Sequence, residues 1–155
     1  AAAMAKKLGV DDSDIIRAIK NLKPVPHRLE LIRNGRISII DDTYNGNPVG
    51  AKRALEVLRE FDGRRVVVTP GLVELGKREK EENEILGKEI ANVANLALII
   101  GRNGEYIRKG LIENGFPEEN ALFFKNLSDA ERFFPDLFSA NDAVLFLNDL
   151  PDELN

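Results

Sequence analysis

The five residues RVVVT, Arg65 to Thr69, decide the fold class that this sequence predicts. Consecutive β-branched residues leave the segment without a polar face, which is typical of a strand buried on both sides of a parallel sheet. Two further apolar runs have the same character, LALII at 96–100 and AVLFL at 143–147, and a shorter strand is expected at Ala121–Phe124. The second part of the chain is therefore predicted to form a mainly parallel sheet.

Segments with helical periodicity separate these strands. In Glu79–Val93, apolar residues recur at positions 85, 86, 90 and 93, so that one face is apolar and the other is charged. The other expected helices run from Pro48 to a stop at Asp62-Gly63, from Gly104 to Asn114 and from Ser128 to Phe134. The alternation predicts an α/β fold, with a Rossmann-like open, mostly parallel sheet and helices on both faces.

An antiparallel β-hairpin is predicted to precede this sheet. The stretches Leu29–Arg33 and Arg36–Ile40 flank Asn34-Gly35. This dipeptide is a strong hairpin signal because both residues of a tight hairpin turn adopt positive φ. We therefore expect two antiparallel strands joined at Asn34-Gly35.

The N-terminal residues are expected to form a separate short part, residues 1–25, ahead of a domain over residues 26–155. Asp12 and Ser13 are helix-capping types, and the helix after them is expected to end near Asn21. The segment KPVPHR has two prolines that stiffen it and end helix formation, so it is the expected linker. The opening AAAMAKKLGV reads as the end of a helix without its own start, which predicts that the chain is cut from a longer protein.

Composition limits the classes of function. The 155 residues suffice for one ordinary domain, and a net charge of −4 argues against a nucleic-acid binder, since phosphate-backbone affinity needs clustered Lys and Arg. The chain has no cysteine and one histidine, which excludes disulfides and thiolate metal sites. No apolar run is long enough to span a bilayer and no signal peptide is recognisable, so a cytoplasmic protein without a membrane partner is expected.

Polar residues follow the predicted strands at their carboxyl ends, where open α/β sheets bind ligands. The first strand end reads DDTYNGN, residues 41–47, the second PGLVE, residues 70–74, the third GRNG, residues 101–104, and the last Asn148-Asp149. The sequence contains neither a P-loop motif nor a GxGxxG motif, so the chain cannot hold a nucleotide with either phosphate-binding loop. The strand ends are therefore the candidate binding residues.

The Asp41-Asp42 pair allows two interpretations. In one, Asp42 or Thr43 caps the following backbone in a turn at the strand end. In the other, a carboxylate accepts hydrogen bonds from ribose hydroxyls or attracts Mg²⁺. Alternation along a strand directs the two carboxylates to opposite faces, and we expect Asp42 to face the ligand.

Arg28 is the candidate cation of the site. A guanidinium held by the stiff PVPH segment is suited to contact a phosphate oxygen in two places. The alternative is a surface ion pair with Glu30 or another neighbouring residue, which contributes less than about 1 kcal/mol. His27 is expected to be a polar linker residue, and the charged run from Lys77 to Glu84 a solvated helix face.

The segments PVPHRLE, from Pro24, and DDTYNGNP, from Asp41, together resemble the start of the C-terminal domain of the Mur ligases. These are the ATP-dependent amide-bond-forming enzymes of peptidoglycan precursor synthesis. With VVVTPGLVELG, the chain is most similar to the members that join D-alanyl-D-alanine to UDP-N-acetylmuramoyl-tripeptide. The resemblance implies that residues 1–25 are the tail of the ligase central domain and its linker, and that residues 26–155 are the C-terminal domain.

The resemblance also implies roles for individual residues. Arg28 matches the arginine that reaches the phosphates and ribose of ATP, and Asp42 matches the acidic residue that holds the ribose. Tyr44 and Asn45 fall where the family has further nucleotide contacts. The residues implied on the side of the incoming amino component are Asn47, Gly71, Glu74, Asn148 and Asp149.

In this family, ATP phosphorylates the carboxylate of the nucleotide-linked peptide, and an amine then attacks the acyl phosphate. The third domain closes over the nucleotide and keeps water away from that intermediate. The P-loop, the Mg²⁺ ligands and the UDP site belong to the first two domains. The resemblance therefore implies no catalytic or metal-binding residue in this chain, which alone is expected to bind ATP weakly at most and to be inactive.

Two loops depart from the family pattern. Many members have an aspartate in a GDM-ELG loop where this chain has Gly71, and a KGS-like turn where it has LNDLP at 147–151. Both loops bear on the amino component, so another Mur-type or folylpolyglutamate-type ligase is an alternative. A non-catalytic module of similar architecture that binds a nucleotide or another protein is a further alternative. It would be favoured if Arg28 and Asp42 pointed into different clefts.

Overall fold

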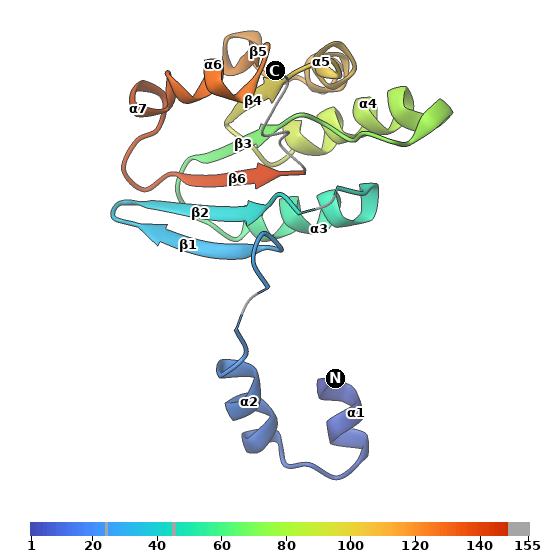
Figure 1. The fold of residues 1–155 in the computed structure, drawn as a ribbon, viewed down its shortest axis with the longest axis vertical. Helices are drawn as coiled ribbons and strands as arrows, with labels where there is room; N and C mark the ends of the chain where they lie inside the picture. Colours follow the sequence, from blue (N-terminus) through green and yellow to red (C-terminus); the bar gives the residue numbers. More distant parts are fainter. Residues whose placement is uncertain (24, 45, 149–155) are drawn as a thin grey trace.

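The structure is a computed structural model that describes residues 1–23, 25–44 and 46–148. Its centre is a six-stranded sheet with the order β1-β2-β6-β3-β4-β5 (Figure 1). β1 pairs antiparallel with β2, and all other neighbours are parallel. The strands are β1 (Glu30–Asn34), β2 (Ile37–Asp42), β3 (Arg65–Thr69), β4 (Leu96–Ile100), β5 (Ala121–Phe124) and β6 (Ala143–Leu147). The prediction of a mostly parallel sheet with a leading hairpin is confirmed.

Helices cover both faces of this sheet, as predicted. On one face lie α3 (Pro48–Arg59), α4 (Glu79–Ala91) and α5 (Gly104–Glu113), and on the other lie α6 (Leu127–Glu131) and α7 (Phe134–Leu137). Val67 packs in the first core, whereas Val66 and Val68 pack in the second. The RVVVT run has no polar position because successive side chains of β3 point into different cores.

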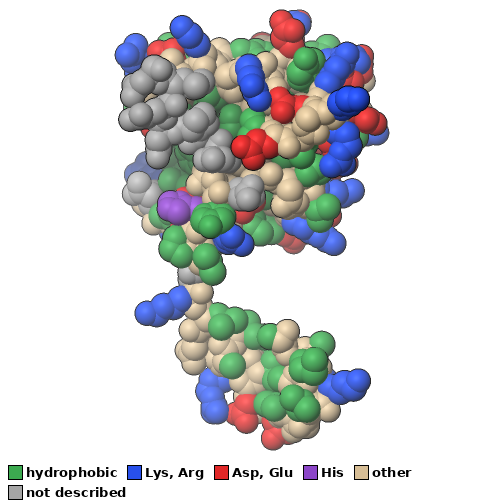
Figure 2. All heavy atoms as spheres, turned by 45° about the vertical axis from the view of Figure 1, so that its right-hand side comes forward, with side chains coloured by type: hydrophobic (Ala, Val, Ile, Leu, Met, Phe, Trp, Pro, Cys, Tyr) green, Lys and Arg blue, Asp and Glu red, His purple; other side chains and the backbone are tan. Residues whose placement is uncertain are grey.

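Two short helices, α1 (Ala2–Lys7) and α2 (Asp12–Lys20), lie apart from the sheet (Figure 1). α2 begins one residue earlier than the capping residues suggested, with Asp11 as N-cap. Neither helix contains a buried residue, and Ile16 and Ile19 are each 52% exposed. Hydrophobic side chains are accordingly visible on the surface of this part (Figure 2). The proposed division into residues 1–25 and 26–155 stays a prediction.

The hairpin turn lies one residue later than predicted. Asn34 still pairs with Ile37, so the two loop residues are Gly35 and Arg36. Gly35 has a φ of 60°, which glycine adopts without steric cost. A glycine at the first loop position therefore fixes the turn, and with it the pairing of Glu30 with Asp41 at the other end of the hairpin.

The helix predicted over Ser128–Phe134 is present as α6 (Leu127–Glu131), but it ends three residues earlier than predicted. The structure has α6 and then, after a break, α7, with Pro135 in the first turn of α7. Proline has no amide hydrogen and disfavours helical geometry in the residue before it. A helix can begin at such a position, but it does not continue through it easily.

The arrangement of β2, β6 and β3 positions the candidate site. These three strands are parallel neighbours, with Asp42 opposite Leu147 and Val68 opposite Phe146. Their carboxyl ends therefore lie at the same edge of the sheet.

Across the part of the chain that the structure describes, no helix has the length and apolar character needed to cross a bilayer.

Candidate functional site

A hollow of about 290 Å³ lies beside the carboxyl end of β2. Its lining comes from the segment before β1, the end of β2 and the first turn of α3: Arg28, Leu29, Asp42, Tyr44, Asn47 and Gly50. Of the predicted nucleotide-side residues, the structure thus brings Arg28, Asp42 and Tyr44 together. Asn45 lies outside the described residues.

The guanidinium of Arg28 lies over the ring of Tyr44, with Cζ 4.2 Å from the ring centroid. An aromatic face attracts such a cation and restricts its movement. The suggested ion pair of Arg28 with Glu30 is replaced by a different contact, since the Glu30 carboxylate accepts the backbone N–H of His27 at 3.3 Å. Arg28 is therefore restrained by a neutral ring, and its charge stays available to a ligand.

The backbone on either side of Arg28 is strained. His27 has a φ of 60° and Leu29 a φ of 50°, values that cost energy in residues with a Cβ. The end of β2 holds this conformation, because Tyr44 N–H donates to the His27 carbonyl at 3.1 Å and Leu29 N–H donates to Asp42 Oδ1 at 3.1 Å. The two left-handed residues turn the chain so that Arg28 lines the same hollow as Asp42.

The contacts of Asp42 offset the cost of burying its negative charge only in part. Burial raises the pKa of Asp42 above its ordinary value, and the nearby Asp41 charge raises it further. The hydrogen bond from Leu29 N–H and the charge of Arg28 lower this pKa only in part. Asp42 therefore has unused capacity to accept hydrogen bonds within the hollow.

Asp41 has the opposite environment. Its carboxylate accepts hydrogen bonds from Thr43 Oγ1 at 2.7 Å and Thr43 N–H at 3.2 Å, and it lies 2.8 Å from His27 Nδ1. Partial burial by itself raises the pKa of Asp41, but the bonds from Thr43 and His27 outweigh it and hold that pKa below its ordinary value. The strand-end turn is thus made by Asp41, not by Asp42 or Thr43, and His27 is more than a linker residue.

The Asp41 contacts predict a pH-dependent contribution to stability. Because its pKa is lowered in the folded chain, the stabilisation is present above the ordinary pKa of about 4 and is lost as the pH falls through the folded value. Replacement Asp41→Asn is expected to lower the free energy of unfolding by about 1–2 kcal/mol at pH 7. Denaturant titrations at a series of pH values should show this difference shrinking as the pH falls below about 4. The exposed Asp62→Asn variant is the control, and a constant difference at all pH values would contradict the assignment.

The predicted acceptor-side residues are not equally accessible. Gly71 is buried, its N–H donates to Thr69 Oγ1 at 3.0 Å, and its carbonyl accepts Asn148 Nδ2 at 3.1 Å. Asn47 caps α3 by accepting Gly50 N–H at 2.9 Å, and Glu74 is exposed. Contacts of these residues with an amino component stay predictions, and Asp149 lies outside the described residues.

The packing at Gly71 explains the departure of this loop from the family pattern. Gly71 has a φ of 85°, and a Cβ there would overlap Oδ1 of Asn83. The Asn83 side chain in turn accepts Leu72 N–H and donates to the Leu72 carbonyl, each at 2.8 Å, and Asn103 Nδ2 donates to the same carbonyl at 3.0 Å. An aspartate cannot replace Gly71 without displacing these buried amides.

Asn83 was missed from the sequence, and Asn103 was identified only as part of a strand end, without a partner. A signal existed for Asn83, which lies on the same helical face as Leu86, Gly87 and Ile90. A polar side chain on a buried face needs a hydrogen-bond partner. The identity of that partner, the Leu72 peptide, could not be read from the helix pattern.

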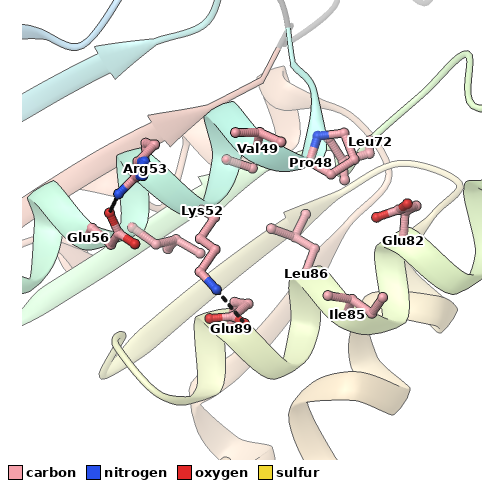
Figure 3. A pocket seen from close by; sticks show the side chains of 12 residues that line it. Pro48, Val49, Lys52, Arg53, Glu56, Leu72, Glu82, Ile85, Leu86 and Glu89 are labelled. Atoms are coloured by element: carbon pink, nitrogen blue, oxygen red, sulfur yellow. Dashed lines mark hydrogen bonds and ion pairs between the residues drawn. The ribbon is translucent and has the colours of Figure 1, made fainter.

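A larger groove of about 430 Å³ lies between α3 and α4 (Figure 3). Apolar side chains such as Val49, Ile85 and Leu86 line it. Its basic residues already face carboxylates, with Lys52 Nζ 3.9 Å from Glu89 Oε1 and Arg53 Nη1 2.6 Å from Glu56 Oε2. The smaller hollow with Arg28 and Asp42 is therefore the better candidate for an anionic, hydroxyl-bearing ligand.

Known proteins resemble this chain over most of its length. The family described as "Mur ligase, glutamate ligase domain" matches residues 27–148. The UDP-N-acetylmuramoyl-tripeptide--D-alanyl-D-alanine ligase of Bacillus subtilis is 25% identical over 150 residues, which cover 94% of this chain and 33% of the relative. The UDP-N-acetylmuramoylalanine--D-glutamate ligase of Pelotomaculum thermopropionicum is 25% identical over 131 residues, covering 84% and 27%.

Solved structures show the same similarity. The crystal structure of MurF ligase from Thermotoga maritima, in complex with ADP, has a TM-score of 0.75 and 26% identity. The match covers 95% of this chain and 32% of that one. The chain thus spans about a third of the length of the first of these curated relatives and of this solved structure.

Proposed function

This chain belongs to the Mur ligase family through its glutamate ligase domain, and we propose that it closes over ATP in a ligase that joins D-alanyl-D-alanine to UDP-N-acetylmuramoyl-tripeptide. The observation that carries the proposal is the presence of Arg28 and Asp42 in one hollow. A non-catalytic module that binds another protein gives no reason for this convergence. The ADP in the Thermotoga maritima relative supports a nucleotide as the ligand.

The residues of the hollow suit different parts of a nucleotide. Arg28 would donate N–H groups to phosphate oxygens, and the ring of Tyr44 would keep its guanidinium from swinging into solvent. Asp42 would accept hydrogen bonds from ribose hydroxyls with the oxygen capacity left beside Leu29 N–H. ATP, when bound, would supply the phosphoryl group that activates the peptide carboxylate. Closure by this domain would keep water out of the site.

No residue of this chain is assigned to Mg²⁺. Within residues 1–23, 25–44 and 46–148, no three His, Cys, Asp or Glu side chains converge as a bound metal would require. Asp42 is engaged by Leu29 N–H and Asp41 by Thr43 and His27. The proposal leaves the metal ligands to the remainder of the ligase, together with the P-loop.

The identity of the amino component is tested on the complete ligase. The enzyme is given UDP-N-acetylmuramoyl-tripeptide, ATP and a panel of amino acids and dipeptides, and phosphate release is measured. We expect turnover with D-alanyl-D-alanine and none from the 155-residue chain alone. Preference for a single amino acid such as D-glutamate would overturn the assignment, and turnover by the isolated chain would contradict the role of a closing domain.

Asp42 gives a second test, in which stability and function change in opposite directions. Because burial raises the pKa of Asp42, its ionised form at pH 7 costs folding free energy. In Asp42→Asn the amide oxygen can still accept Leu29 N–H, so the free energy of unfolding of the chain is expected to stay equal or rise. The KM of the complete ligase for ATP is expected to rise about tenfold or more, since a charged hydrogen bond is lost. A less stable variant with unchanged KM would refute both arguments.

A further inference from the structure

Asn148, the residue directly after β6, bonds to the ends of both neighbouring strands. β6 lies between β2 and β3 in the sheet. The backbone N–H of Asn148 donates to the carbonyl of Asp42, and its side-chain Nδ2 donates to the carbonyl of Gly71, each at 3.1 Å. Asn148 therefore links the strand end that carries the hollow to the loop on the predicted acceptor side.

The packing around Asn148 leaves its side chain little freedom. Asn148 is 3% exposed, and a Cβ on Gly46 would overlap its Oδ1. Its φ of 67° is a left-handed conformation that asparagine tolerates better than most residues. The side chain is thus held between the segment that follows Asp42 and the loop at Gly71.

The far end of this link is equally fixed. Leu72 is 1% exposed. Its backbone N–H donates to the side chain of Asn83, and its carbonyl accepts hydrogen bonds from Asn83 and Asn103. A buried network in which every group is paired resists displacement, because movement would leave polar groups unsatisfied. The loop is therefore anchored at two adjacent residues, at Leu72 by the amides of Asn83 and Asn103 and at Gly71 by Asn148.

We propose that Asn148 is a positioning residue, which holds the loop of residues 70–74 at a fixed distance from Asp42. The inference rests on the proposed function, in which the nucleotide and the amino component approach each other across these two strand ends. Since the Asn148 Nδ2 is bonded to Gly71, the residue acts through the backbone of its neighbours. A misplacement of reacting groups by about 1 Å can lower a rate about 100-fold.

Two variants separate the side chain of Asn148 from its backbone. Asn148→Gly permits the positive φ and keeps the backbone bond to Asp42, but it removes the bond to Gly71. Asn148→Asp keeps the size of the side chain and sets a carboxylate oxygen against the Gly71 carbonyl. We expect kcat of the complete ligase to fall about tenfold in Asn148→Gly and further in Asn148→Asp, and the KM for the amino component to rise. The KM for ATP should change least, because Asp42 keeps its bond.

The control variant is Asp142→Asn, at the opposite end of β6. Asp142 is 2% exposed and binds Arg64 through Nε at 3.1 Å and Nη2 at 2.6 Å. Its replacement should lower the melting temperature at least as much as Asn148→Gly while leaving kcat and both KM values unchanged. If the three variants lose activity only in proportion to lost stability, Asn148 has a structural role alone and the inference is overturned.

A measurement on the 155-residue chain separates this inference from the proposed function. In Asn148→Gly, the NMR amide signals of residues 71–74 and of Thr43, Tyr44 and Gly46 should shift together, whereas Asp142→Asn should leave both groups unchanged. This readout needs no substrate. Unchanged signals in residues 71–74 would overturn the inference even if the ligase reaction is as proposed. Shifted signals would support the inference even if the ligase uses another amino component.

Discussion

Replacement of Arg28 by alanine is expected to lower kcat/KM of the complete ligase about 100-fold or more. The guanidinium is the cation that lines the hollow together with Asp42. In the proposed nucleotide site, the alanine variant would lose the hydrogen bonds of this guanidinium to phosphate oxygens. The free energy of unfolding should change little, because Arg28 is exposed and its side-chain contact is with the Tyr44 ring. Steady-state kinetics with ATP as the varied substrate measures the effect.

Two further variants make the Arg28 prediction specific. Arg28→Lys keeps the charge but loses the planar fork, so its kcat/KM should lie between those of the wild type and the alanine variant. Arg36→Ala removes the same charge from the loop at the other end of the hairpin and should have no effect. Equal kinetics for Arg28→Ala and Arg36→Ala would show that only net charge matters and would remove the main support for the nucleotide site.

Replacement of Gly110 by alanine is expected to lower the free energy of unfolding by about 3 kcal/mol. Gly110 in α5 faces Gly87 in α4, and a Cβ on Gly110 would overlap the backbone carbonyl of Glu84. A backbone group cannot rotate away as a side chain can, so the two helices must separate. Helix propensity acts in the opposite direction and favours alanine by about 1 kcal/mol, so the sign of the measured change shows which effect is larger.

The control for Gly110 is the same substitution in a helix with more room. At Gly50 in α3, the nearest atom to an added Cβ is Asn47 Nδ2 at 3.3 Å, a side-chain atom that can move. Gly50→Ala should therefore be nearly neutral in a denaturant titration of the chain. The double variant Gly87→Ala/Gly110→Ala should lose less than the sum of the single losses, because helices already separated have room for the second methyl group. A more stable Gly110→Ala chain would show that the helices are not in backbone contact.

Much of the fold could be predicted because its signals are local. The strands at 65–69, 96–100, 121–124 and 143–147 lie where the apolar runs placed them. The hairpin turn was misplaced by one residue because both Asn34 and Gly35 are suited to the first loop position. The strand pairing places Asn34 in β1 and Gly35 at the first loop position. Both faces of a strand such as AVLFL are apolar, so nothing in it indicates its neighbours, and its place between β2 and β3 was not predicted.

The part of the candidate site that has local sequence signals was also predicted. Arg28 and Asp42 were identified from a stiff segment, a polar strand end and a family resemblance, and the structure places both in one hollow. The pairing of His27 with Asp41 was missed because a single histidine in a linker has no local signal. The contacts of the Leu72 backbone with Asn83 and Asn103 were missed because these partners come from α4 and from the residue before α5, far apart in the sequence.

The sequence by itself determined the α/β class, the strands and the residues at their ends, because side-chain periodicity and turn chemistry act over a few neighbouring residues. Only the tertiary structure decided that β6 lies between β2 and β3, so that Asn148 bonds to both Asp42 and Gly71. It also gave Asp41 and Asp42, adjacent in the chain, opposite pKa shifts. Burial and hydrogen-bond partners depend on residues far away in the sequence, and their positions are fixed only when the sheet and its helices pack.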